Sequence, residues 1–502
     1  MDTSVVIVGA GPAGLMLAGE LRLAGLDVIV LERLSQRTRE SRGIGFTIRT
    51  MEVFDERGLL RRFGEYQTSG MGHFGGLPLN MGVLGAYHEA ARTIPQSLTE
   101  EVLESWAAEL GARILRGHEF QWLDDVGDFV TVTALGPAGE ERIRARYLVG
   151  CDGGRSSVRN ATGFDFPGTP ATTEMLLADV RGVDLEPRMT GQHIGGGFVM
   201  VGKLPGGIHR IIVGERGIPP RRRTEPPAFS EVADLWKRLT GSDISTAEPV
   251  WVSAFGDATR QVTEYRRGRV LLAGDAAHVH LPAGGQGMNT SVQDSYNLGW
   301  KLALVLRGDA PETLLDTYHV ERHEAGRMML ANTQAQSQLV LGGAEAQPVR
   351  DVLSELIRYP EVARHLAAKV SGLDIRYDVG GGDNPLLGRR MPHLPLTVGS
   401  RTTSSTELLR RGRGVLLDLA DNAVLRGRAR GWRDRVDIVT ATAPPAPAAP
   451  AAEEPFGRGR TAGVSAVLLR PDGYVAWTAP GSHHSLTVAL TRWFGPAGAT
   501  RR

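Results

Sequence analysis

Hydrophobic and polar positions come in blocks at the start of the chain. An uninterrupted apolar run, Val5–Val8, leads into Gly9-Ala10-Gly11-Pro12-Ala13-Gly14, then into a helical pattern, and a second apolar run ends at Glu32. A short apolar run bounded by a turn is typical of a buried strand. The pattern therefore predicts a strand, a tight turn, a helix and a second strand.

The glycines of this loop have separate physical roles. Gly9 allows a sharp turn, Gly11 lets the backbone approach a pyrophosphate, and Gly14 lets the helix pack closely on the strand. The phosphates would then lie at a helix N-terminus, which supplies free N–H groups and the positive end of the helix dipole. Glu32 follows the loop by about twenty residues, where a carboxylate accepts hydrogen bonds from an adenosine ribose. An acid there disfavours a 2′-phosphate, so we expect FAD or NAD rather than NADP.

The polarity pattern changes twice further along the chain. From residue 172 to about 266, short alternating segments are separated by Gly and Pro, which predicts a β-rich domain inserted into the first domain. Residues 269–275 return to a buried strand and residues 290–306 to a helical pattern, so the first domain resumes there. The last hundred or so residues contain three strand candidates, at 414–419, 436–439 and 464–469, and a turn at 470–474 with Pro second and Gly fourth. The predicted domain ranges are 1–171, 172–266, 267–391 and 392–502.

Composition narrows the class of protein. Hydrophobic residues at 41% and charged residues at 23% are ordinary for a globular chain, and the net charge of +1 gives no reason to expect nucleic acid or a membrane surface as a partner. No apolar stretch approaches the roughly 18 residues of a transmembrane helix, and no leader pattern precedes the first strand. We therefore expect a cytoplasmic protein. The single cysteine, Cys151, excludes an internal disulfide, a Cys-x-x-Cys pair and a cysteine-rich metal site, so any redox chemistry must belong to an organic cofactor.

A second motif is more specific than the first. Residues 274–289 read Gly-Asp-Ala-Ala-His-Val-His-Leu-Pro-Ala-Gly-Gly-Gln-Gly-Met-Asn. Asp275, at a strand end, can accept hydrogen bonds from ribityl hydroxyls, and the glycine-rich loop and helix start can present N–H groups to a flavin edge that becomes negative on reduction. His278 and His280 lack an acidic or histidine cluster at metal-ligand spacing, so we expect no metal site.

These motifs identify a resemblance to the single-component FAD monooxygenases of the para-hydroxybenzoate hydroxylase type. Three motifs of that family are present in order and at its spacing: Gly9 to Gly14, Asp152-Gly153 and Gly274-Asp275. Within the family, the chain looks most like the actinobacterial hydroxylases of aromatic polyketides, the angucycline and anthracycline tailoring enzymes. The stretches that carry this likeness are 41–47, 73–76, 250–255 and 278–289, and the resemblance covers essentially the whole chain.

The resemblance implies a fold, a reaction and a set of cofactor contacts. The implied fold is α/β, with a Rossmann-like FAD-binding domain split by a β-rich substrate domain, and a C-terminal thioredoxin-like domain that has no cysteine for dithiol chemistry. The implied reaction uses O2 and NADPH, the latter held transiently at a surface cleft, and hydroxylates an aromatic ring through a flavin C4a-hydroperoxide. From motifs and resemblance together, the expected FAD contacts are Gly9, Gly11, Pro12, Ala13, Gly14, Glu32, Arg33, Arg42, Gln96, Asp152, Gly274, Asp275, Pro282, Gly285, Gln286, Gly287, Met288 and Asn289.

The expected substrate is large and flat. Phe74, Phe198 and Met200 lie in apolar, glycine-spaced stretches which, with Pro282, suit a polycyclic aromatic polyketide, an angucyclinone, better than a single phenol. Arg376 is a candidate cation beside the ring oxygen, where it would favour the phenolate, and an interdomain salt bridge is the alternative. No catalytic side chain is assigned, because the chemistry is centred on the flavin. Four alternatives stay open: a FAD oxidoreductase without oxygen insertion, a non-catalytic FAD-binding homologue, and a hydroxylase of an anthracyclinone or of a simple phenol. The homodimer is likewise left open.

Overall fold

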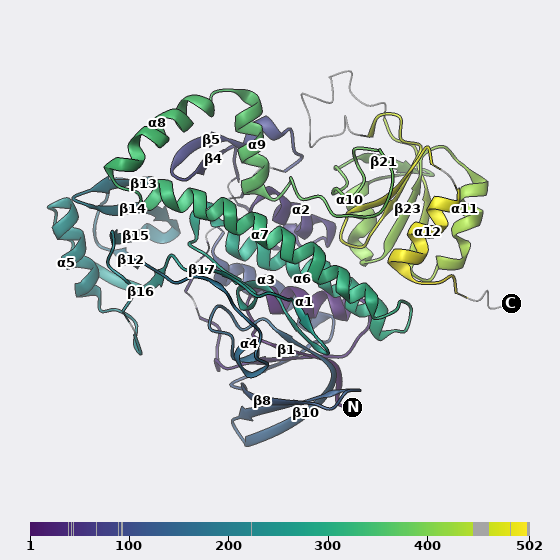
Figure 1. The fold of residues 1–502 in the computed structure, drawn as a ribbon, viewed down its shortest axis with the longest axis horizontal. Helices are drawn as coiled ribbons and strands as arrows, with labels where there is room; N and C mark the ends of the chain where they lie inside the picture. The colour runs from purple at the N-terminus through teal and green to yellow at the C-terminus, as the bar shows by residue number, and fades with distance from the viewer. Residues whose placement is uncertain are drawn as a thin grey trace.

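The computed structural model describes residues 1–38, 40, 41, 43, 45–66, 68–88, 90, 91, 94–221, 223–444, 461–481 and 483–498. A β-rich lobe and a C-terminal lobe lie at opposite ends of the molecule (Figure 1). Between them lies an α/β region that includes the N-terminus. The long helix α7 (Thr313–Leu341) runs from one side of this region to the other.

A largely parallel sheet forms the centre of the α/β region. Its main path runs in the order β18-β19-β10-β1-β2-β7, and all of these neighbours are parallel except β18 and β19. The strands are β1 (Thr3–Val8), β2 (Val28–Glu32), β7 (Arg113–Arg116), β10 (Gly139–Gly150), β18 (Arg266–Arg267) and β19 (Val270–Leu272). Although β19 follows the β-rich lobe in sequence, it pairs with β10, so the chain returns to this sheet at Val270. The antiparallel strands β8 (Glu119–Asp125) and β9 (Val130–Gly136) extend β10 on one side.

Three helices pack together beside this sheet: α1 (Pro12–Leu23), α3 (Gln96–Glu109) and α6 (Gln286–Leu306). Trp106 of α3 lies directly against Gly19 of α1, where an added Cβ would come within 2.0 Å of the indole ring. Ser295 of α6 donates to the carbonyl of Ala13 in the first turn of α1 at 2.7 Å. The glycine loop and the second motif are thereby brought to neighbouring helix starts.

The β-rich lobe is a five-stranded antiparallel sheet in the order β13-β14-β15-β12-β16. Its strands are β12 (Glu174–Arg181), β13 (Arg188–Ile194), β14 (Gly197–Leu204), β15 (Ile208–Glu215) and β16 (Glu248–Gly256). One face packs on α5 (Phe229–Thr240) through alternate residues such as Leu176, Val199 and Ile211. The other face, which carries Met175, Phe198 and Phe255, turns toward the glycine-rich loop at Leu281 and Ala283.

Shorter elements complete the α/β region. They are β3 (Thr68–Ser69), β4 (Met71–Phe74), β5 (Leu77–Asn80), β6 (Ala90–Ala91), β11 (Gly168–Thr169), β17 (Thr259–Gln261), β20 (His278–Val279), α2 (Ile48–Glu56), α4 (Ser157–Ala161), α8 (Gln347–Leu356) and α9 (Pro360–Ser371). The β4–β5 hairpin packs on α9 and on Leu339 of α7. A segment near the N-terminus therefore lies beside helices made almost three hundred residues later.

The C-terminal lobe contains a four-stranded sheet in the order β24-β23-β25-β26, in which β23 and β24 are parallel and the other pairs antiparallel. Its elements are β21 (Pro395–Val398), β22 (Arg401–Ser404), α10 (Ser405–Leu408), β23 (Gly414–Asp418), α11 (Ala423–Ala429), β24 (Val436–Thr440), β25 (Ala466–Leu469), β26 (Val475–Ala479) and α12 (His483–Phe494). The three strands predicted here from the sequence are confirmed.

Candidate active site

The glycine loop has the geometry that its residue types predict. Gly9 has φ of +103°, and a Cβ there would lie 2.4 Å from the carbonyl oxygen of Cys151. A Cβ on Gly14 would lie 2.0 Å from the carbonyl oxygen of Gly9, so the start of α1 touches the loop backbone. Around Gly11 no atom of the described residues lies within 4 Å of an added Cβ, which leaves open space at the N-terminus of α1 in this part of the structure. A pyrophosphate can approach the backbone there and meet free N–H groups.

Glu32 stands at the end of β2, next to this loop. Its Oε2 accepts from the backbone N–H of Ala10 and its Oε1 from that of Leu34, both at 2.9 Å. These two bonds fix the carboxylate and leave acceptor capacity for ribose hydroxyls, since each carboxylate oxygen has two lone pairs. Arg33 is exposed beside it.

Two aspartates of the second motif have opposite environments. Asp275 is exposed, and its carboxylate accepts a 3.4 Å hydrogen bond from the hydroxyl of Ser291. Asp294 is fully buried and accepts from the N–H of Gly274 at 3.0 Å, from His278 Nε2 at 2.8 Å and from Arg322 Nε at 2.7 Å. Burial alone would raise the pKa of Asp294, but the neighbouring Arg322 and His278 hold it below its ordinary value. Asp294 therefore fixes the strand end from which Asp275 projects into solvent.

The glycine-rich loop leads directly into α6. Gly284 and Gly285 have φ of +69° and +66°, a left-handed conformation that favours glycine. Gly285 is the N-cap of α6 and provides no side chain to cap the helix, so the first N–H groups of α6 face outward without an internal partner. Asn289 ties this turn to the N-terminal segment, because its Oδ1 accepts from Thr47 N at 2.8 Å and its Nδ2 donates to Gly285 O at 2.7 Å.

The other residues of this loop that were predicted to contact FAD differ in solvent exposure. Pro282 and Gly285 are exposed, Gln286 is buried, and Gly287 and Met288 are intermediate, with Met288 in contact range of Gly43. His280 lies within the same loop, where its Nδ1 lies 2.6 Å from the carbonyl of Leu281 and burial lowers its pKa to about 4. It is therefore neutral at pH 7.

Of three further residues predicted to contact the cofactor, two form hydrogen bonds with protein groups and one lies outside the described residues. Asp152 accepts from Ser156 Oγ at 2.5 Å and from the N–H groups of Ser157 and Val158, so its carboxylate caps α4, and burial raises its pKa. Gln96 begins α3 and accepts from Gly43 N at 3.4 Å. Arg42 lies outside the described residues.

An apolar wall is formed where the β-rich lobe and the end of α7 meet the glycine-rich loop. We give this name to Met175, Phe198, Met200, Ile212, Phe255, Leu281, Ala283, Val340 and Leu341, which form one hydrophobic cluster. Five of its members, Met200, Ile212, Phe255, Val340 and Leu341, are only partly buried. A partly exposed apolar surface beside a polar loop is typical of a ligand-binding site. Phe198 and Met200, predicted as substrate contacts, both belong to it.

Two predicted substrate residues do not reach the apolar wall. Phe74 is buried in a separate cluster with Leu79 and Leu339, against α9. Arg376 is exposed, and its Nε donates to Leu387 O at 2.9 Å. Arg376 therefore has a protein partner in this structure, and its place beside the substrate ring stays a prediction.

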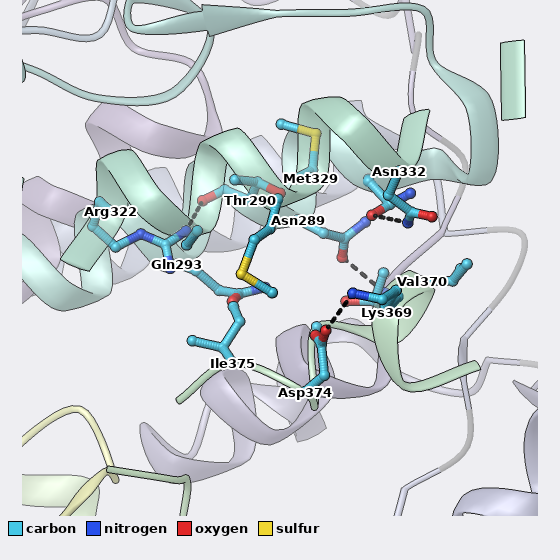
Figure 2. Close-up of a pocket in the computed structure, with 15 residues that line it drawn as sticks. Asn289, Thr290, Gln293, Arg322, Met329, Asn332, Lys369, Val370, Asp374 and Ile375 are labelled. Carbon is cyan, nitrogen blue, oxygen red and sulfur yellow. Dashed lines mark hydrogen bonds and ion pairs between the residues drawn. The ribbon is translucent and has the colours of Figure 1, made fainter. Parts of the chain in front are cut away.

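A small polar cavity lies behind the first turns of α6 (Figure 2). Its volume is about 40 Å³, and α6, α7 and α9 contribute Gln293, Asn332 and Lys369 to its lining. Gln286 Nε2 and Gln293 Oε1 are buried there without a hydrogen-bond partner among the described residues. A space of this size with such groups suits a few ordered waters and is far too small for a flavin or a polycyclic substrate.

Among the described residues, no cluster of three or more His, Cys, Asp or Glu side chains could hold a metal ion. In the same part of the chain, none of the helices has the length and apolarity needed to cross a membrane.

The residues present fit FAD. The open space at Gly11, the fixed carboxylate of Glu32, the exposed Asp275 and the uncapped N–H groups of α6 match the pyrophosphate, ribose, ribityl chain and flavin edge in that order. Fold and site together define a flavin-dependent enzyme.

Comparison with known proteins specifies the family. Residues 2–333 match the FAD binding domain family, and residues 384–497 match the aromatic-ring hydroxylase C-terminal family. The chain belongs to the FAD-dependent aromatic hydroxylases and, within them, to the monooxygenases of aromatic polyketides.

Three relatives illustrate the likeness. The crystal structure of CabE, an aromatic hydroxylase from angucycline biosynthesis, is 63% identical, covers 99% of this chain and 100% of its own, and superposes with a TM-score of 0.95. BexE, studied for oxidation during BE-7585A biosynthesis, is 67% identical over 99% of this chain and 100% of its own, with a TM-score of 0.93. Rifampicin monooxygenase from Streptomyces venezuelae is 42% identical over 507 residues, 99% of each chain.

Sequence reasoning missed the residues that organise the site from behind. Asp294 belongs to the second motif, but its pairing with Arg322 is not visible in the sequence, because 28 residues separate them and Arg322 belongs to none of the motifs. The hydrogen bond between His278 and Asp294, which are 16 residues apart, is likewise visible only in the structure, where the strand end packs against α6.

Proposed function

We propose that this monooxygenase uses NADPH and O2 to hydroxylate a polycyclic aromatic polyketide, an angucyclinone, through a flavin C4a-hydroperoxide. The observation that carries the proposal is the apolar wall, whose partly exposed side chains from the β-rich lobe and from α7 stand beside the glycine-rich loop. Its length along several strands suits a fused ring system better than one ring. The likeness to CabE, from angucycline biosynthesis, supports the same substrate class.

The protein contributes positioning, exclusion of water and hydrogen-bond donors. When bound, FAD supplies the electron transfer and oxygen activation. The apolar wall bears no charged side chain, so a hydroxylated ring stacked there loses solvent and is held at one orientation. The uncapped N–H groups at the start of α6 favour negative charge on the flavin edge after reduction.

Product analysis by mass spectrometry tests this function. The purified protein with FAD, NADPH and O2 should add one oxygen to a tetracyclic angucyclinone faster than to an anthracyclinone, and much faster than to para-hydroxybenzoate. Preferential turnover of the monocycle would overturn the substrate class and leave the flavin chemistry intact. NADPH consumption that yields only hydrogen peroxide with all three would favour an oxidoreductase without oxygen insertion.

A pair of variants on β14 tests the wall itself. Met200→Trp fills the wall and should raise KM for the tetracycle about tenfold or more while FAD binding stays normal. Lys203→Trp, on the exposed part of the same strand, is the matched control and should leave KM unchanged. Equal effects of both substitutions would remove the wall from the substrate site.

We further propose the domain division 1–171, 172–266, 267–391 and 392–502, with a thioredoxin-like last domain. The strand order β24-β23-β25-β26, with one parallel and two antiparallel pairs followed by α12, supports that assignment. Limited proteolysis should release the last range as a single fragment.

A further inference from the structure

We propose that Arg470 and Asp472, in the C-terminal lobe, are positioning residues for the FAD site. Both belong to the buried turn, residues 470–474, which joins β25 to β26. The sequence predicts a turn here, and the structure confirms it: Gly473 N donates to Arg470 O at 2.9 Å. A turn of this composition ordinarily lies in solvent, yet Arg470 is 0% and Asp472 1% exposed.

The charges of the buried turn pair with a residue of α7. Arg470 donates through Nη1 and Nη2 to the two carboxylate oxygens of Glu321, at 2.5 and 2.8 Å, and through Nε to Asp472 Oδ1 at 3.0 Å. Lys301 Nζ of α6 lies 2.7 Å from Glu321 Oε2, and Asn297 Nδ2 of α6 donates to both Glu321 and Asp472. The turn therefore joins α6 to α7 through fully buried charges.

The backbone of the buried turn fastens α2 in the same way. Arg49 Nη2 donates to the carbonyl of Asp472, and Arg57 Nη2 to that of Pro471, each at 2.9 Å. Arg49 is 1% exposed and pairs with Glu56, which also accepts from the hydroxyl of Tyr296 on α6 at 2.7 Å. Three helices, α2, α6 and α7, thus meet on one turn of the C-terminal lobe.

Each of these helices carries a part of the FAD site. The N-terminus of α6, with its uncapped N–H groups, lies about 16 Å along the helix from Asn297. The residue after Glu321 is Arg322, which bonds Asp294 and through it Gly274. The N-cap of α2, Thr47, is bonded to Asn289 in the first turn of α6. A shift of any of the three helices would move a donor or the strand end that faces the flavin.

Because the charges of the turn are buried, losing one of them destabilises the packing of α2, α6 and α7 as a whole. If Arg470 loses its charge, the carboxylates of Asp472 and Glu321 remain buried with one cation fewer, an arrangement that is strongly unfavourable. The helices must then separate to admit water. Because a bound group that needs the assembled helices is weakened by the free energy of reassembling them, the turn and the flavin are thermodynamically coupled.

The test compares full-length variants as apoproteins titrated with FAD. Arg470→Gln and Asp472→Asn should raise the FAD dissociation constant about fivefold or more, the range usual for coupled sites, and Arg470→Lys should fall between them and the unaltered protein. The midpoint potential of the bound flavin should become more negative, because the N–H donors of α6 no longer stabilise the reduced form fully. Leu425→Ala in α11 is the control, since it removes core methyls of the same lobe without touching the turn.

The proposal fails if Asp472→Asn changes the FAD dissociation constant by less than twofold and leaves the midpoint potential of the bound flavin unchanged within experimental error. It fails equally if Leu425→Ala, at the same loss of Tm, changes them as much as the turn variants do. Should Arg470→Gln not fold, Asp472→Asn, which is nearly isosteric, and Arg470→Lys decide the outcome.

Discussion

Asp294→Asn is the perturbation whose outcome the structure determines most closely. All three partners of this carboxylate donate to it: Gly274 N, His278 Nε2 and Arg322 Nε. An amide in the same place must turn its NH2 group toward at least one donor, and it removes the negative charge beside a guanidinium that is 1% exposed. Breaking a buried ion pair from one side costs about 3–5 kcal/mol.

The expected fall in Tm follows from the size of the protein. At about 2.1 cal/mol/K per residue, cooperative unfolding of 502 residues has an entropy near 1 kcal/mol/K, so this loss lowers Tm by about 3–5 °C. Differential scanning calorimetry of the apoprotein measures it. Asp275→Asn is the matched control: its carboxylate is exposed, forms no ion pair with the described residues and accepts only a long 3.4 Å hydrogen bond from Ser291, so Tm should stay within about 0.5 °C while FAD retention falls. A Tm for Asp294→Asn within about 1 °C of the unaltered protein would refute the reasoning.

Three further outcomes are expected. Gly14→Ala should purify without FAD, because its Cβ would lie 2.0 Å from Gly9 O. Gly11→Ala, with open space around its Cβ, should keep its Tm and lose FAD affinity. Calorimetry and the flavin-to-protein absorbance ratio measure both effects, and equal losses of Tm in the two variants would contradict this reasoning. Glu32→Gln should weaken FAD by about 10–100-fold in fluorescence titrations, since hydrogen bonds to a charged acceptor are worth about 1.5–3 kcal/mol, and an unchanged affinity would remove the ribose assignment. His280 has a folded pKa of about 4, below its ordinary 6.5, so the stability it contributes is fully present above pH 6.5 and is lost as pH falls toward 4, by about 3 kcal/mol at most. In His280→Gln the decline of Tm over that pH range should be shallower, and an identical decline would show that other groups cause it.

The parts of the fold that could be predicted are those fixed by local conformation. Gly9 needs a left-handed φ and Gly14 a close contact, so the residue types alone indicate the loop, the helix and both strands. The turn at 470–474 was predicted for the same reason, from Pro and Gly at fixed positions. Its burial could not be, because it depends on Arg49 and Glu321, which are 423 and 149 residues away from their partners in the turn.

In the candidate site too, features within one short segment could be predicted, whereas contacts between distant segments could not. Asp275 and the loop after it were recognisable because one short segment carries both the acid and the glycines. The apolar pattern that selected Phe198 and Met200, which lie in one hydrophobic cluster, also selected Phe74, which packs in another. Arg376 was selected for its place between two predicted domains, and its hydrogen bond to Leu387 O is a contact that its position in the sequence does not indicate.

The position of the buried turn near the end of the sequence also affects when the FAD site is assembled during synthesis. At a synthesis rate of about 5–20 residues per second, Arg470 leaves the ribosome about 20–90 s after Gly14, because 456 residues separate them. During that interval α2, α6 and α7 lack the charges that the buried turn adds between them. On the coupling proposed above, flavin binds the nascent chain more weakly before Arg470 emerges than after it, so capture of the cofactor is biased toward the later part of synthesis.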